Sequence, residues 1–159
     1  PRVIDKLVLL KNDTGSNPFG QHVAAAFARS GELRAHIDRL VAVYRDKCDR
    51  MLAALEEHMP EGARWSRPDG GFFIWLTLPP GVDSVELLAR SRDQGVEFLP
   101  GVACYGDGRG RDEARLAFSF VKADDIAPGI ARLGQTVLQL MAAASDTPRD
   151  QHLTRPYTK

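Results

Sequence analysis

The sequence predicts an α/β chain in which N-terminal helices lead into a long connecting helix, followed by a small sheet of about three strands packed by helices. Two observations support this fold class. Apolar residues recur every three or four positions in residues 1–59 and again in residues 124–144, which is the period of an amphipathic helix. Between these regions, short aromatic and β-branched runs are bounded by glycine and proline, as is typical of strands.

Three helices are expected before any strand. Residues 1–12 have one apolar side and begin with proline, which the first helical turn tolerates. Residues 13–20 are rich in turn formers and predict a loop, after which residues 21–29 predict a second helix. From Glu32 an apolar stripe continues for about 27 residues, or ~40 Å at 1.5 Å per residue. A helix of that length is expected to bridge two bodies or line an interface.

Three strands and two further helices follow. Residues 72–78 form an apolar run between paired glycines and paired prolines, which indicates a buried strand, and residues 96–99 predict a short strand that Pro100 stops. Residues 115–120 alternate, with an apolar side made of Leu116, Phe118 and Phe120. The intervening and closing helices are predicted over residues 85–94 and 124–144.

The composition excludes several classes of protein. The chain has 159 residues, and its 21 Lys and Arg balance its 21 Asp and Glu, which argues against partners held by bulk charge such as nucleic acid or anionic lipid. No apolar run approaches the roughly 20 residues that cross a bilayer. With two distant cysteines and no leader, a cytoplasmic location is expected. The first methionine is Met51, so we expect a processed start or part of a longer protein.

Most sequence motifs that would let the chain bind a metal, bind phosphate or act as a nucleophile by itself are incomplete. The four histidines and two cysteines have no ligand spacing, so no metal site is predicted. Ser119 and Lys122 match a Ser-x-x-Lys pattern by chance, because its companion motifs are absent. The glycines of residues 106–110 precede a strand rather than a helix, so they predict a turn and not a phosphate loop. Cys48 is expected in the core and Cys104 in a loop.

Arg115 is the candidate binding residue. It opens a predicted strand whose other side is aromatic and aliphatic, and a rigidly held guanidinium suits bidentate capture of a carboxylate. From this feature alone, an edge-strand arginine in solvent is an equally good interpretation.

Four motifs in order resemble a known family. Residues 65–79 (Trp-Ser-Arg-Pro-Asp-Gly-Gly-Phe-Phe-Ile-Trp-Leu-Thr-Leu-Pro), 95–101 (Gly-Val-Glu-Phe-Leu-Pro-Gly), 115–120 (Arg-Leu-Ala-Phe-Ser-Phe) and the helix around 125–133 are similar to the C-terminal part of pyridoxal-phosphate-dependent aminotransferases of fold type I, class I/II. The subgroup it resembles contains the 2-aminoadipate, kynurenine and multi-substrate aminotransferases. The resemblance implies that residues 1–44 end a large domain and enter the connecting helix and that 45–144 form the C-terminal small domain. Residues 145–159 are polar and contain two prolines, so a disordered tail is expected there.

The resemblance also implies roles for particular residues. Arg115 would bind the α-carboxylate of amino acid and 2-oxo acid substrates, Gly71 and Phe72 would lie at the substrate entrance, and Ser16 and Asn17 would lie near the cofactor, pyridoxal 5'-phosphate, in a homodimer. The lysine that holds this cofactor belongs to a motif that the chain lacks, so the chain alone is expected to be inactive.

Two other functional classes of protein are compatible with the sequence. The same domain serves as the effector-sensing part of GntR/MocR-type transcription regulators, which an upstream winged helix would reveal. The second class is an interaction module that has become detached from the enzyme. The unpartnered apolar stripes of residues 1–44 predict that the chain self-associates.

Overall fold

The computed structural model describes residues 2–10 and 17–146 of the chain. The chain divides into two compact units, Pro1–Ala42 and Val43–Lys159. Most of the tail predicted for residues 145–159 lies outside the described residues, although the last helix continues through Asp146. Among the described residues, no helix is both long and apolar enough to span a bilayer.

The first unit contains α1 (Arg2–Leu10), α2 (Pro18–Arg29) and the beginning of α3 (Glu32–His58). None of its described residues is buried. Helix α2 begins earlier than the sequence predicts because Asn17 caps it: the Asn17 side chain accepts a hydrogen bond from the backbone N–H of Phe19 at 3.0 Å. Pro18 then occupies the first turn, where its missing N–H is no loss.

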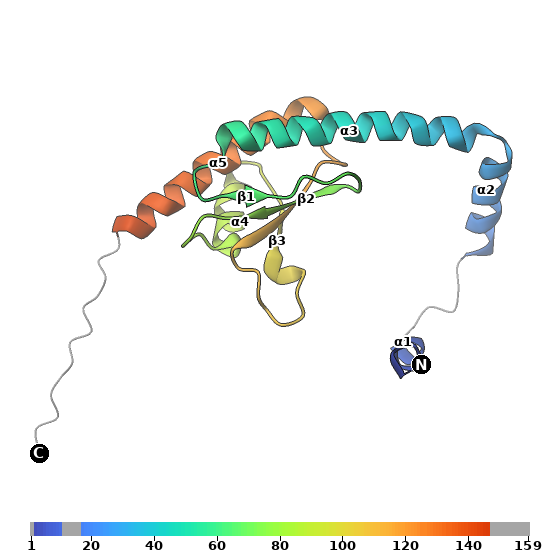
Figure 1. Ribbon diagram of the computed structural model, residues 1–159, viewed down its shortest axis with the longest axis horizontal. Coiled ribbons are helices and arrows are strands. Elements are labelled where there is room, and N and C mark those ends of the chain that lie inside the picture. Colours follow the sequence, from blue (N-terminus) through green and yellow to red (C-terminus); the bar gives the residue numbers. More distant parts are fainter. Residues whose placement is uncertain (1, 11–16, 147–159) are drawn as a thin grey trace, which may run out of the picture. The chain divides into compact units, whose positions relative to one another are not determined.

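The second unit holds the hydrophobic core. The second half of α3, together with α4 (Ser84–Asp93) and α5 (Ala123–Asp146), packs against one face of a small sheet (Figure 1). The three helices contribute the apolar side chains that the stripe predicts, among them Met51, Leu55, Leu87, Ile126, Leu133 and Val137. The helices α3 and α5 meet closely at Gly134. A Cβ added to this glycine would lie against the carbonyl oxygen of His58.

The sheet has four antiparallel strands in the order β1-β2-β4-β3, so the prediction of about three strands was one short. They are β1 (Arg64–Trp65), β2 (Phe73–Thr77), β3 (Leu99–Pro100) and β4 (Glu113–Ala117). Strand β1 was missed because two residues are too few to show an alternating pattern.

Two strands are also shifted from their predicted positions. Strand β4 spans Glu113–Ala117 rather than residues 115–120, because Glu113 and Ala114 already pair with β2 and the chain leaves the sheet after Ala117. Phe120 therefore lies outside the strand and is 98% exposed, whereas Leu116 and Phe118 are buried as predicted. Strand β3 includes Pro100, which pairs with Ala114 at the edge of the sheet, where a missing N–H is tolerated.

The segment that joins β3 to β4 is tightly folded. It opens with a 3-10 turn, Gly101–Ala103, and continues through the turn predicted for residues 106–110, which is confirmed. Gly110 has a φ of +85°, and a Cβ there would lie 2.6 Å from the ring of Tyr105. Only glycine therefore allows the ring to lie on the backbone at this point.

Candidate functional site

Arg115 lies in the middle of β4 rather than at its beginning. Trp75 on β2 and Leu99 on β3 are its neighbours across the two ladders, so all three side chains share one face of the sheet. That face is opposite the one that packs against the helices, because Ile74, Leu76, Ala114 and Leu116 alternate with it and are buried. Arg115 is half-buried, whereas every other arginine in the described part of the chain is exposed.

The guanidinium of Arg115 is stacked but not paired with a charge. Its Cζ atom lies 4.1 Å from the centre of the Phe73 ring. Its buried Nε has no hydrogen-bond partner, and no carboxylate among the described residues pairs with the guanidinium. A buried donor without a partner costs about 1–3 kcal/mol. The outer N–H groups of the guanidinium also have no charged partner among the described residues, so they can donate to a ligand that carries a carboxylate.

Aromatic rings continue from Phe73 along one side of the site. Phe72 meets Phe73 edge-on with the ring centres 6.4 Å apart, and Tyr44 of α3 meets Phe72 at 5.1 Å. Lys47, one turn further along α3, donates a hydrogen bond to the backbone carbonyl of Ser119 at 2.9 Å. The two contacts tie α3 to the same corner of the sheet, where the segment before β2 meets the end of β4.

A second aromatic pair lies on the other side of Arg115. The ring of Tyr105 meets Trp75 edge-on at 6.0 Å, and the guanidinium of Arg109 lies 4.3 Å above the Tyr105 ring. A hydrogen bond with the Glu113 carboxylate raises the pKa of the Tyr105 phenol, which is therefore neutral at physiological pH.

The loop beside the site is held to α4 by Asp83. The Asp83 carboxylate caps α4 by accepting hydrogen bonds from the N–H groups of Val85 and Glu86, and the guanidinium of Arg111 lies 2.6 Å from it. Burial raises the pKa of Asp83, but the two backbone hydrogen bonds and Arg111 outweigh it, so that the pKa is lowered overall. The backbone N–H of Ser84 also donates to the carbonyl of Arg111 at 2.6 Å.

The other residues predicted for the site lie in different parts of the chain. Phe72 is 46% exposed and directly precedes β2, and Gly71 before it has a φ of +86°, which favours glycine. Asn17 lies in the first unit, where its side-chain oxygen caps α2. Ser16 lies outside the described residues. The structure thus links Phe72 to Arg115 through the ring of Phe73, and Gly71 directly precedes Phe72 in the chain.

Among the described residues, the remaining nucleophilic and metal-ligating groups are not clustered. Cys48 is buried on α3, where burial and then Asp49 raise the pKa of its thiol, and Cys104 is exposed in the loop, as the sequence predicts. Within residues 2–10 and 17–146, no cluster of three histidine, cysteine or acidic side chains could hold a metal ion.

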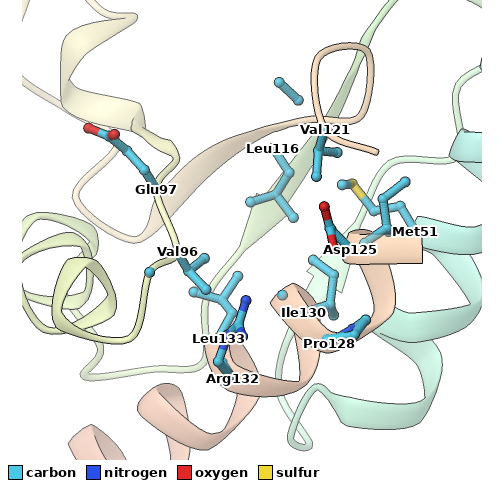
Figure 2. Close-up of a pocket in the computed structure, with 14 residues that line it drawn as sticks. Met51, Val96, Glu97, Leu116, Val121, Asp125, Pro128, Ile130, Arg132 and Leu133 are labelled. Atoms are coloured by element: carbon cyan, nitrogen blue, oxygen red, sulfur yellow. The ribbon is translucent and has the colours of Figure 1, made fainter. Parts of the chain in front are cut away.

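A cavity of about 350 Å³ lies on the other side of the sheet, between β4, the beginning of α5 and the segment before β3 (Figure 2). Its walls are both polar and apolar: Glu97, Asp125 and Arg132 line it with apolar side chains, and Asp125 points inward near Met51 and Val121. Leu116 lines it and faces away from Arg115, its neighbour in β4, so the cavity is separate from the arginine site.

Sequence reasoning missed the aromatic partners of Arg115. Phe73 and Trp75 are two positions apart in β2 and therefore share the face of the arginine. The sequence predicts a buried strand here but not which residues face the arginine. Its alternation was hidden because the residues on both faces are apolar.

The chain is similar to aminotransferases over most of its length. It is 37% identical over 143 residues to aromatic-amino-acid aminotransferase 1 of Thermococcus litoralis, which covers 89% of this chain and 34% of that protein. The crystal structure of Pyrococcus horikoshii kynurenine aminotransferase matches with a TM-score of 0.76 and 42% identity, over 87% of this chain and 35% of that one. The multiple substrate aminotransferase of Thermococcus profundus matches with a TM-score of 0.77 and 36% identity, over 90% and 36% of the two chains.

A regulator is also similar. The chain is 30% identical over 145 residues to the HTH-type transcriptional regulator YisV of Bacillus subtilis, across 87% of this chain and 29% of the regulator. No family model matches the chain. The chain spans about a third of the length of the curated aminotransferases that it matches.

Proposed function

We propose that Arg115 binds the α-carboxylate of an amino acid and of the matching 2-oxo acid. The chain belongs with the C-terminal part of the fold-type I aminotransferases. The observation that carries this proposal is a half-buried guanidinium without a counter-charge on the open face of the sheet. Amino donor and amino acceptor share only the α-carboxylate and the carbon skeleton next to it. A single arginine can therefore serve both halves of an amino transfer.

The chemistry of the guanidinium suits this task. Its planar fork offers parallel N–H donors at the spacing of the two carboxylate oxygens, and it stays charged at every physiological pH. The strand fixes the backbone of Arg115 between two neighbouring strands. The α-carbon of a bound substrate would thus be held at a fixed distance from the sheet, and such positioning is a large part of catalysis.

The whole protein is proposed to use pyridoxal 5'-phosphate, which when bound makes the substrate's α-carbon acidic. The described lysines do not fit its attachment: Lys6 and Lys122 are exposed, and the ammonium of Lys47 is bonded to Ser119. We therefore assign cofactor attachment to another part of the protein and expect the 159-residue chain to be inactive alone. Asn17, with Ser16, is proposed to approach the cofactor across a homodimer.

The domain assignment is part of the same proposal. Residues 1–44 would end the large domain and enter the connecting helix, and residues 45–144 would be the small domain, whose closure over the substrate would exclude water. Gly71 and Phe72 would then lie at the substrate entrance. We infer a cytoplasmic homodimer that acts on amino acids and 2-oxo acids.

The experiment measures amino transfer by the whole protein with and without the substitution Arg115→Lys. The point charge of lysine cannot reproduce the fork, so kcat/KM should fall about tenfold to hundredfold, the equivalent of one lost charged hydrogen bond. The matched control is Arg64→Lys, which changes an exposed arginine on strand β1 of the same sheet and should stay within about twofold. Equal losses in both variants, or no loss in either, would contradict the proposal.

A second function is favoured by the similarity to the Bacillus regulator. In such a protein Arg115 would bind an amino acid effector and the activity would be control of transcription. The sequence before Pro1 decides between the two. A winged helix with a basic recognition helix there would favour the regulator, and a complete large domain without one would favour the enzyme.

A further inference from the structure

We propose that Phe73 is a positioning residue that sets the plane of the Arg115 guanidinium for carboxylate capture. This inference rests on the proposed function, because it assumes that Arg115 is the carboxylate ligand. It adds the physical device that keeps the arginine ready. The device is a row of aromatic rings from α3 to the guanidinium.

The register of the sheet explains how the two side chains meet. Phe73 pairs with Ala117, and Arg115 lies two residues before Ala117 on the same strand and the same face. Phe73 is therefore the diagonal neighbour of Arg115, at a separation that a long side chain can bridge. The direct neighbour, Trp75, is engaged by Tyr105, so its ring does not replace Phe73.

The contact geometry is that of a cation stacked on a ring. The Cζ atom of Arg115 lies 4.1 Å from the Phe73 centre, well within the roughly 6 Å over which the ring quadrupole attracts a cation. One flat face of the guanidinium is thus covered, and its Nε is buried. Its outer edge is the part left to meet a ligand. An unstacked arginine would instead sample many rotamers, and ordering them would weaken binding.

The orientation of Phe73 is itself held. Phe72 meets it nearly perpendicularly, at 86°, and Tyr44 meets Phe72 at 76°. Edge-to-face arrangements of this kind are the favoured ones for aromatic pairs. The backbone carbonyl of Phe72 also accepts a hydrogen bond from the N–H of Phe118 at 3.2 Å, which fastens this corner to the end of β4.

Core packing alone does not explain the ring. Phe73 is 41% exposed and faces away from the three helices, so it fills little of the hydrophobic core. An apolar side chain that is exposed to this extent and lies under a half-buried cation is better explained by what it does for the cation.

The test follows the Nε–Hε resonance of Arg115 in the ¹⁵N-labelled 159-residue chain, assigned with Arg115→Lys. In the parent chain the ring current of Phe73 should shift this resonance upfield of the other arginines. Phe73→Leu should abolish the shift and weaken pyruvate binding, titrated at constant ionic strength, by about threefold. Phe73→Tyr keeps the ring and should restore both. Phe120→Leu makes the same change at an exposed position and should alter neither.

Each outcome decides a separate point. An unchanged Arg115 resonance and an unchanged pyruvate affinity in Phe73→Leu would overturn the positioning role, and so would a Phe73→Tyr variant that behaves like Phe73→Leu. If Phe73→Leu fails to fold, Phe73→Met replaces it, since methionine also fills the position without a ring, and a shift and affinity like those of the parent would then count against the role. Failure of Arg115→Lys to weaken pyruvate binding would instead contradict the proposed function.

Discussion

The two units of this chain differ in what holds them together. In residues 43–146 the helices and the sheet bury a common set of apolar side chains, whereas the described residues of the first unit bury none. The helices of the first unit are nevertheless strongly one-sided, and α1 exposes Val3, Ile4, Leu7, Val8, Leu9 and Leu10. An amphipathic pattern therefore predicts a helix equally well in both units, but only the second unit supplies its own partner surface.

The largest expected effect comes from removing a leucine in each unit. Leu133 on α5 is fully buried, so Leu133→Ala should lower the free energy of unfolding by about 2–5 kcal/mol. Leu9 on α1 is 83% exposed, and Leu9→Ala should change it by less than about 0.5 kcal/mol. Urea denaturation followed by tryptophan fluorescence is the suitable measurement, because both tryptophans, Trp65 and Trp75, lie in the second unit. Similar losses for the two variants would show that Leu9 is packed as tightly as Leu133.

Two glycines of α5 sharpen the comparison within the second unit. Gly134 faces the backbone of α3 at His58, so Gly134→Ala should force the helices apart and destabilise the unit by about 1–3 kcal/mol. Gly129 has open space around it, and Gly129→Ala should stabilise the helix by about 0.5–1 kcal/mol. The same denaturation experiment checks both. Equal signs would mean that α3 and α5 do not meet as closely as described.

A smaller effect is expected from the two helix caps. Asp83→Ala removes the cap of α4 in the second unit and should cost about 1 kcal/mol near neutral pH. The pKa of Asp83 is lowered in the folded state, so its contribution is present above the unfolded pKa of about 3.9 and is lost as the pH falls through the folded pKa. The difference between Asp83→Ala and the parent should accordingly shrink in acid.

Asn17→Ala is the matched cap removal in the first unit. Since α2 buries nothing, this variant should leave the tryptophan-detected unfolding unchanged at every pH. A loss comparable to that of Asp83→Ala would show that the second unit depends on the first.

The sequence predicted helices better than strands, and the reasons are local. The stripe of α3 extends over 27 residues, so an error at one end changes little, and the structure has the helix at Glu32–His58. Strand β1 has two residues and no period, and β4 was extended to Phe120 because Leu116, Phe118 and Phe120 alternate. Whether a strand continues is decided by pairing with β2, which the sequence of one strand does not contain.

The candidate site was predictable only in part. Arg115 was found because a charged residue in an otherwise apolar strand is unusual. The stacking of Arg115 on Phe73 could not be predicted, because the contact depends on the register between β2 and β4. Likewise, Tyr105 reaches Trp75 through a loop whose course depends on glycines at positions 108 and 110 with positive φ.

All buried apolar side chains of the described residues lie in the second unit, so we expect this unit to fold without residues 1–42 and to hold Arg115 in place for a carboxylate. The most direct measurement compares the Nε–Hε resonance of Arg115 in the 159-residue chain with that in a chain that begins at Val43. We expect the same position in both chains and the same saturable movement when pyruvate is added. A resonance that moves to the position of an exposed arginine on removal of residues 1–42, or that no longer responds to pyruvate, would contradict it.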